Sequence, residues 1–133
     1  MLVDDEEMIT DAIGSLLEKV GYRVICVNGG KEAVRVVEQF RDDINLVILD
    51  MLMPDMDGQK TFHRIKDIQP QLPVLMASGY NNREQLADIM QNGCKGFIRN
   101  RTPSPNGGPP FNAFCPKIRT HLKTVQPDKK VRL

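Results

Sequence analysis

The sequence predicts an α/β domain with an open parallel sheet, because short apolar runs alternate with segments of helical period along residues 1–99. Apolar residues recur every three or four positions in four segments, and runs rich in aliphatic or β-branched residues separate them. The run Leu46–Leu49 is apolar at every position, as expected for a strand buried on both faces. Strands that alternate with helices in this way are parallel and joined by right-handed crossovers.

The first half of the chain supplies three of the predicted strands and two helices. Leu2–Val3 is the first strand, and the apolar spacing of segment 9–20 predicts a helix that ends at Gly21. Tyr22–Val27 has the β-branched content of a second strand. The turn residues at 28–30 lead into a second helix, and Leu46–Leu49 follows as the third strand. The expected apolar face of the second helix comprises Ala33, Val36, Val37 and Phe40.

The second half completes the alternation and then departs from it. Segment 62–68 has helical period and ends before two prolines, Val74–Ala77 predicts a strand, segment 86–90 a helix, and Gly96–Ile98 a fifth strand. Five of the nine prolines fall within segment 102–116. We therefore expect a domain over residues 1–125, with an irregular, insertion-like segment at 100–116 and a last helix near 116–125. Residues 126–133 are expected to form a basic tail.

Composition narrows the class of protein. The 133 residues suffice for one domain with a core, and 18 basic against 17 acidic residues give a net charge of +1. That balance argues against nucleic acid as a partner. The sequence has no apolar stretch near the roughly 18 residues of a membrane span, so no membrane partner is expected. The three cysteines lack Cys-x-x-Cys spacing, which predicts reduced, buried thiols in a cytoplasmic protein.

Carboxylates follow two of the predicted strands. Asp4 and Asp5 come directly after Leu2–Val3, and Asp50 comes directly after Leu46–Leu49. In the flavodoxin-like order 2-1-3-4-5, ligands bind where strand order reverses, between the first and third strands. Carboxylates about 5 Å apart repel by roughly 3 kcal/mol per pair at an effective dielectric near 20, so a cation is expected among them. Oxygen ligands of this kind predict Mg²⁺.

Such a pocket supports chemistry at Asp50. Carboxylates act as nucleophiles that form acyl-phosphate intermediates, and a divalent cation offsets repulsion of the incoming phosphoryl group. The fourth strand is followed by Ser78, which places a hydroxyl at the same edge of the sheet. An aspartate-dependent phosphatase is a further reading of Asp50, but such enzymes have a second aspartate two residues on, where this chain has Leu52. A calcium loop beginning at Asp55 is rejected because Lys66 stands where a glutamate is needed.

Three stretches together carry a family resemblance: residues 2–6 (LVDDE), 49–58 (LDMLMPDMDG) and 93–98 (GCKGFI). They resemble the signatures of two-component response-regulator receiver domains, whose fold is flavodoxin-like (CheY-like), and the resemblance covers residues 1–99. The sequence of residues 78–80 and 93–98 is most similar to that of receivers of hybrid sensor histidine kinases. The resemblance implies transfer of a phosphoryl group from a histidine kinase or phosphotransfer protein, and a conformational switch as the output.

Position by position, the resemblance implies a role for each site residue. Asp50 would be the phosphoacceptor, with Mg²⁺ held by Asp5, by Asp4 directly or through water, by Asp50 and by the backbone carbonyl of Leu52. Ser78 would be the hydroxyl that turns toward the phosphate, and Phe97 the aromatic that swings inward with it. Activity would be limited to phosphorylation and dephosphorylation of Asp50. Dimerisation through the face of the fourth and fifth helices is a further implication.

One position departs from the family pattern. Receivers carry a lysine three residues after the aromatic, and here Asn100 occupies that position. Asparagine can donate a hydrogen bond to phosphate but brings no positive charge. A second reading therefore stays open, in which the chain is a pseudo-receiver, a protein-interaction module with impaired phosphorylation. Magnesium-dependent labelling with a phosphoryl analogue distinguishes the two readings.

Overall fold

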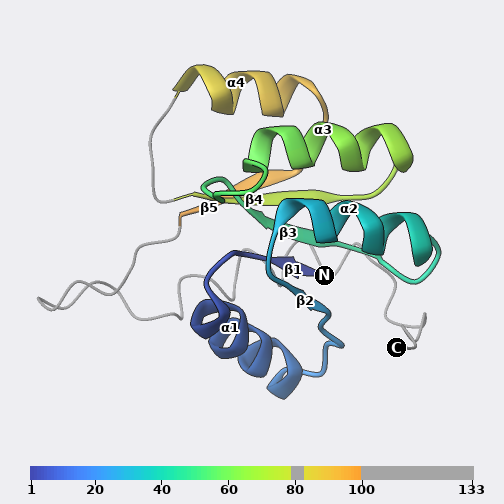
Figure 1. Cartoon of the computed structure of the whole chain (residues 1–133), viewed down its shortest axis with the longest axis vertical. Coiled ribbons are helices and arrows are strands. Elements are labelled where there is room, and N and C mark those ends of the chain that lie inside the picture. Colours follow the sequence, from blue (N-terminus) through green and yellow to red (C-terminus); the bar gives the residue numbers. More distant parts are fainter. Residues whose placement is uncertain (79–82, 100–133) are drawn as a thin grey trace, which may run out of the picture.

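The computed structural model describes residues 1–78 and 83–99, and these form a parallel sheet with helices on both faces (Figure 1). Strands and helices alternate strictly along the described chain. The strands are β1 (Leu2–Val3), β2 (Cys26–Val27), β3 (Val47–Asp50), β4 (Val74–Ser78) and β5 (Gly96–Arg99). The helices are α1 (Glu7–Lys19), α2 (Gly30–Gln39), α3 (Gly58–Ile68) and α4 (Arg83–Gln91). The predicted alternation is confirmed for these residues.

The sheet has the predicted order β2-β1-β3-β4-β5, with all described pairings parallel. Leu2 and Val3 of β1 pair with Ile48 and Leu49 of β3, so the first strand lies beside the third. The strand order therefore reverses between β1 and β3. The ends of these two strands are the edge at which such sheets bind ligands.

Helices cover the sheet on its two faces (Figure 1). Alternate apolar residues of β1, β3 and β4 belong to two different buried clusters. On the face covered by α1, Ile13 and Leu17 pack with Leu2, Ile48 and other buried strand residues. A larger buried cluster on the opposite face contains residues of α2, α3 and α4. Among its members are Val3, Ala33, Val37, Val47, Leu49, Phe62, Ile65, Val74, Met76 and Ile89. The alternation of side chains along each strand sorts the apolar residues into these two layers.

The predicted second strand is wrong in length. Only Cys26–Val27 of the predicted Tyr22–Val27 is a strand, because the strand that pairs with it, β1, is two residues long. A strand needs a ladder of backbone hydrogen bonds, and residues 22–25 lie beyond the end of that ladder apart from the bond that the Leu2 N–H donates to the Ile25 carbonyl. β-branched content indicated the strand but could not set its length.

Several apolar residues and one cysteine are more exposed than predicted. Phe40 follows the last turn of α2 and is 39% exposed, so it is not part of the buried face of that helix. On α1 the buried stripe is narrower than the apolar pattern, since Leu16 remains 37% exposed. Cys94 is buried as predicted, whereas Cys26 is exposed, and Cys115 lies outside the described residues. Among the described residues, no helix has the length and apolar character that crossing a bilayer requires.

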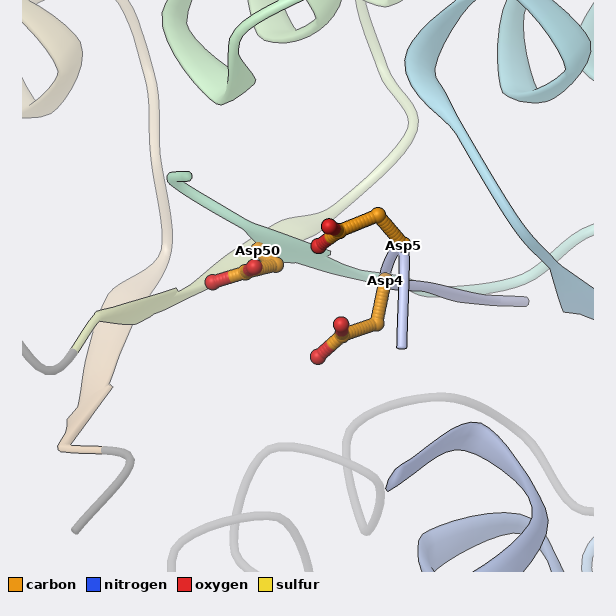
Figure 2. Close-up of side chains that lie close together, drawn as sticks. All are labelled: Asp4, Asp5 and Asp50. Carbon is orange, nitrogen blue, oxygen red and sulfur yellow. The ribbon is translucent and has the colours of Figure 1, made fainter. Parts of the chain in front are cut away.

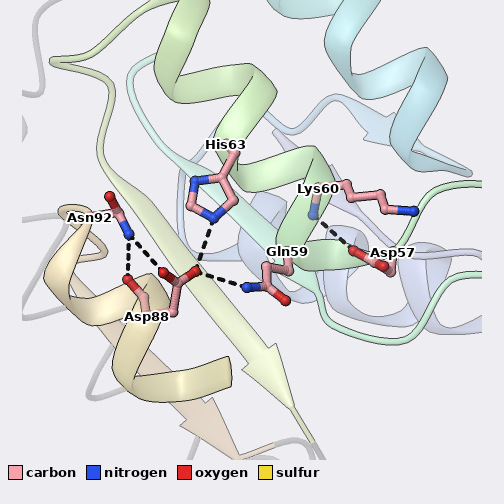
Figure 3. A network of polar contacts seen from close by, with 6 residues as sticks. All are labelled: Asp57, Gln59, Lys60, His63, Asp88 and Asn92. Carbon is pink, nitrogen blue, oxygen red and sulfur yellow. Dashed lines mark hydrogen bonds and ion pairs between the residues drawn. The ribbon is translucent and has the colours of Figure 1, made fainter. Parts of the chain in front are cut away.

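Polar side chains join α3 to α4 around Asp88 (Figure 3). The Gln59 amide donates to Asp88 Oδ2 at 2.8 Å, and His63 Nε2 lies 3.0 Å from the same oxygen. Asn92, directly after α4, donates to Asp88 Oδ1 at 3.1 Å and to the Asp88 carbonyl at 2.7 Å. We call Gln59, His63, Asp88 and Asn92 the α3–α4 polar cluster. It connects the two helices at their surface, above the buried contact of Ile89.

Candidate functional site

Three carboxylates come together at the ends of β1 and β3, and we call Asp4, Asp5 and Asp50 the acidic cluster. One oxygen from each lies within 4.8 Å of the others, so a single cation can contact all three. Figure 2 shows the carboxylates of Asp4 and Asp5 extending from the end of β1 toward the side on which Asp50 lies. Parallel pairing of β1 with β3 causes this convergence, because it aligns the carboxyl ends of both strands. The structure thus brings together the three carboxylates that the sequence singled out.

Burial and mutual repulsion make the cluster costly to ionise. Asp50 is partly buried, and desolvation, followed by the charge of Asp4, raises its pKa to about 7. Backbone N–H groups of Leu52 and Met51 oppose that rise without cancelling it. Asp4 is only 5% exposed, and desolvation likewise raises its pKa, although the Glu6 N–H donates to Asp4 Oδ1 at 2.9 Å. Asp5 is exposed.

These features fit a hard divalent cation. The cluster offers only carboxylate oxygens, one of them buried and two more accessible, and Mg²⁺ takes a small number of carboxylates while keeping water in its shell. A buried carboxyl with a raised pKa is a group whose ionised form lacks a compensating charge, and a cation supplies one. The observed geometry therefore agrees with the cation predicted from sequence.

The backbone next to Asp50 is held closely against α3. The Gly58 N–H donates to the Met51 carbonyl at 3.0 Å, which closes the loop between β3 and α3. A Cβ atom at Gly58 would collide with the Asp50 carbonyl oxygen and lie 2.6 Å from Met51 Cα. Only glycine allows this approach. Asp57 then caps α3, since its Oδ1 accepts the Lys60 N–H at 2.8 Å (Figure 3).

The other predicted site residues are placed less completely. Leu52, two residues after Asp50, is 63% exposed. Phe97, in β5, is partly buried and packs against the larger core cluster. Ser78 is the last residue of β4, so its backbone lies at the same edge of the sheet as Asp50, while its side chain is outside the described part of the structure. Asn100 also lies outside the described residues.

Sequence reasoning missed one contact of the loop between β3 and α3. Asp55, considered from sequence only as a calcium ligand, accepts hydrogen bonds from the first two residues of α2. No local pattern predicts a contact between residues 25 positions apart. The run Asn28-Gly29-Gly30 was a usable signal, because consecutive glycines often mark a close approach of another segment.

Residues 1–103 match the response regulator receiver domain family. The chain belongs to this family. A putative two-component response regulator of Arabidopsis thaliana, ARR21, is 36% identical over 98 residues, which is 74% of this chain and 16% of that protein. The transcriptional regulatory protein GlrR of Escherichia coli is 32% identical over 98 residues, 74% of this chain and 22% of that protein. The matched region is thus about a fifth of the length of these two relatives.

Solved structures share the fold of this receiver domain. A CheY-like receiver domain protein of Methanospirillum hungatei superposes with a TM-score of 0.78 at 24% identity, covering 92% of this chain and 91% of that one. A receiver domain protein of Clostridium thermocellum superposes with a TM-score of 0.72 at 29% identity, over 76% and 80% of the two chains. The flavodoxin-like (CheY-like) fold predicted from the sequence is confirmed.

Proposed function

We propose that this receiver domain accepts a phosphoryl group on Asp50, with Mg²⁺ bound by the acidic cluster, and signals through the resulting change of charge. The observation that carries the proposal is the convergence of Asp4, Asp5 and Asp50 at the point where strand order reverses. Membership of the receiver family supports it, because the donor in two-component signalling is a histidine kinase or a phosphotransfer protein.

The proposed reaction is a direct transfer between side chains. An Asp50 carboxylate oxygen attacks the phosphorus of a phosphohistidine, the new O–P bond forms, and the P–N bond breaks as the imidazole leaves and takes up a proton. When bound, Mg²⁺ supplies positive charge that offsets repulsion between the carboxylate and the phosphoryl oxygens. Asp4, Asp5 and the Leu52 carbonyl would hold the ion. The fixed backbone of β3 orients Asp50, and Ser78 and Phe97 would respond to the added charge.

Mass spectrometry after incubation with acetyl phosphate and Mg²⁺ tests the proposal. We expect one phosphoryl adduct on the wild-type protein, none on Asp50→Asn, and none when EDTA replaces Mg²⁺. Asp43→Asn, which removes a carboxylate outside the acidic cluster, is the matched control and should be labelled like the wild type. An adduct that persists in Asp50→Asn would contradict the assignment of the acceptor.

The same experiment addresses the pseudo-receiver reading that Asn100 raised. An unmodified wild-type protein that still binds Mg²⁺ would show that the acidic cluster is intact but that transfer fails. Replacing Asn100 by lysine then gives a sharp comparison, since the substitution restores a positive charge at the family position. Labelling in Asn100→Lys alone would attribute the impairment to that residue.

We further propose that the donor is the kinase region of a hybrid sensor histidine kinase, because residues 78–80 and 93–98 are most similar to receivers of that class. Transfer from a panel of phosphorylated kinases, timed in seconds to minutes, tests it. A separate kinase that phosphorylates Asp50 faster than any hybrid kinase would overturn the assignment. Dimerisation through the face of the fourth and fifth helices stays a prediction, to be checked by sedimentation with and without beryllium fluoride.

A further inference from the structure

The loop between β3 and α3 (residues 51–57), which we call the site loop, is attached to the core at two points. Met51 and Met53 are each 7% exposed and belong to the larger core cluster. Leu52, between them, is 63% exposed, so its own side chain contributes little to holding the loop. After Met53, Pro54, Asp55 and Asp57 are exposed, so the second half of the loop depends on contacts other than burial of its side chains.

Asp55 provides such a contact with α2. Its Oδ1 accepts the Gly30 N–H at 3.4 Å and its Oδ2 accepts the Lys31 N–H at 3.3 Å. The residue before α2, Gly29, has no side chain to cap the helix, so Asp55 caps α2 from another segment. Burial alone would raise the pKa of Asp55, but the N–H groups of Met56, Lys31 and Gly30 outweigh it and lower the pKa. The carboxylate is thus stabilised in its charged, accepting form.

The glycines at the start of α2 allow this arrangement. A Cβ atom at Gly29 would lie 3.0 Å from Asp55 Oδ2, and one at Gly30 would lie 2.8 Å from the Met56 carbonyl oxygen and collide with the Thr61 hydroxyl. The start of α2 therefore packs directly on the backbone of the site loop. The helix is itself anchored, because Ala33 and Val37 are completely buried against the sheet.

We propose that Asp55 is a positioning residue for the phosphoacceptor site, which holds the site loop against the start of α2 and so keeps the Leu52 carbonyl in place for Mg²⁺. The inference rests on the proposed function. A loop that is already ordered loses less conformational freedom when the ion binds, and this raises affinity without any contact between Asp55 and the ion. Residues that orient metal ligands act in the same way.

Mg²⁺ titration calorimetry on Asp55→Ala and Asp55→Asn tests the inference. Loss of the anchor in Asp55→Ala should weaken Mg²⁺ binding about tenfold, the lower end of the range for residues that support metal ligands. Asp55→Asn has the same net charge as Asp55→Ala but keeps an oxygen that accepts a backbone N–H, so we expect its affinity to stay close to that of the wild type. Glu32→Gln, which removes a charge from the first turn of α2, should bind Mg²⁺ normally.

A readout without metal separates anchoring from general stability. Amide hydrogen exchange at Gly30 and Lys31 should be faster in Asp55→Ala than in the wild type, while thermal unfolding changes little. Equal Mg²⁺ affinity in Asp55→Ala and the wild type would overturn the inference and leave the proposed function standing. Equal weakening in Asp55→Ala and Asp55→Asn would also overturn it, in favour of a charge effect. A wild-type protein without Mg²⁺ affinity would overturn both.

Discussion

At the scale of single residues, the acidic cluster that is expected to bind a cation lowers the folding stability of the metal-free protein. Asp50 ends a buried strand, and its ionised form is disfavoured by desolvation and by Asp4, so its pKa is raised from 3.8 to about 7. Between these two values the folded protein binds a proton at Asp50 that the unfolded chain has released. Stability in the absence of metal therefore falls as pH rises through this window. A site built to bind a cation is expected to destabilise the protein that lacks one.

Replacing Asp50 by asparagine should remove the loss of folding stability that accompanies ionisation of Asp50 as pH rises. In EDTA at pH 8 we expect Asp50→Asn to be more stable than the wild type by about 1–2 kcal/mol, a modest gain because the Asp50 carboxylate keeps contact with solvent. Well below pH 3.8 the advantage should vanish, since Asp50 is then protonated in both the folded and the unfolded state. Urea unfolding at several pH values measures it, and an advantage independent of pH would contradict the explanation.

Gly58→Ala tests the close approach of α3 to Asp50. The new Cβ would collide with the Asp50 carbonyl, so we expect a loss of about 1–3 kcal/mol, as for other overpacked sites, together with weaker Mg²⁺ binding. Gly93→Ala is the comparison, because Gly93 has φ +96° and no atom within 4 Å of the added Cβ. It should lower stability through backbone strain and leave Mg²⁺ affinity unchanged. Equal Mg²⁺ affinities in the two variants would refute the role given to Gly58.

How much of the site the sequence predicted depends on whether a fold rule brings each residue to its partners. Asp4, Asp5 and Asp50 were predicted to meet because each follows a strand, and fold rules place strand ends together. Asp55 was not placed, because its partners at the start of α2 are set by packing of two glycines against the site loop. Contacts of that kind depend on the tertiary arrangement and leave no periodic pattern.

At the scale of elements, the sequence predicted which segments are helices and strands better than where they end. Helical period depends on residues three and four apart, and the four described helices follow it. The length of β2 depends on its pairing with β1, which ends after two residues. The β-branched content of residues 22–27 could not show where that pairing stops. Phe40 fits the apolar period of α2 but follows its last turn, so it is exposed.

The α3–α4 polar cluster gives a prediction about the stability of one element. The Gln59 amide first, and His63 second, hold the pKa of Asp88 below its usual value of 3.8. Its stabilising effect is therefore present above pH 3.8 and is lost as pH falls through the lower folded value. Asp88→Ala should speed amide exchange in α4 at neutral pH and lower Tm by on the order of 2 °C, because exposed polar contacts contribute little.

Gln59→Ala is the matched variant for this cluster, since it removes one donor and keeps the Asp88 carboxylate. We expect a smaller increase of exchange in α4 than in Asp88→Ala, and no change in α1, which lies on the other face of the sheet (Figure 1). Exchange rates in α4 of Asp88→Ala that match the wild type would show that the α3–α4 polar cluster does not hold this helix on α3.

At the scale of the whole molecule, the strand order was predicted from alternation and the fold rule, and the structure confirms it. Topology follows from a few binary choices, such as parallel pairing and crossover hand, so it survives errors in element length. Residues 100–116 offered no such pattern, and the predicted last helix at 116–125 lies outside the described residues.

Metal binding should stabilise the entire domain. A ligand that binds only the folded state adds about 2.7 kcal/mol at 100 times its Kd, so Tm should rise with Mg²⁺ concentration. The rise should be larger at pH 8 than at pH 6, because Asp50, with a pKa of about 7, must be ionised to bind the cation. Thermal unfolding at both pH values measures it. A Mg²⁺-dependent rise in Asp50→Asn equal to that of the wild type would place the ion elsewhere.

The pairing of β1 with β3 has a consequence for how the protein acquires its site during folding. Leu2 meets Ile48, so the two halves of the acidic cluster are joined only after a long loop closes, and pairings of this kind form slowly. During synthesis the chain has no site until the third strand has left the ribosome and found the first. A cation bound there stabilises late, non-local contacts, so it should slow unfolding far more than it speeds folding.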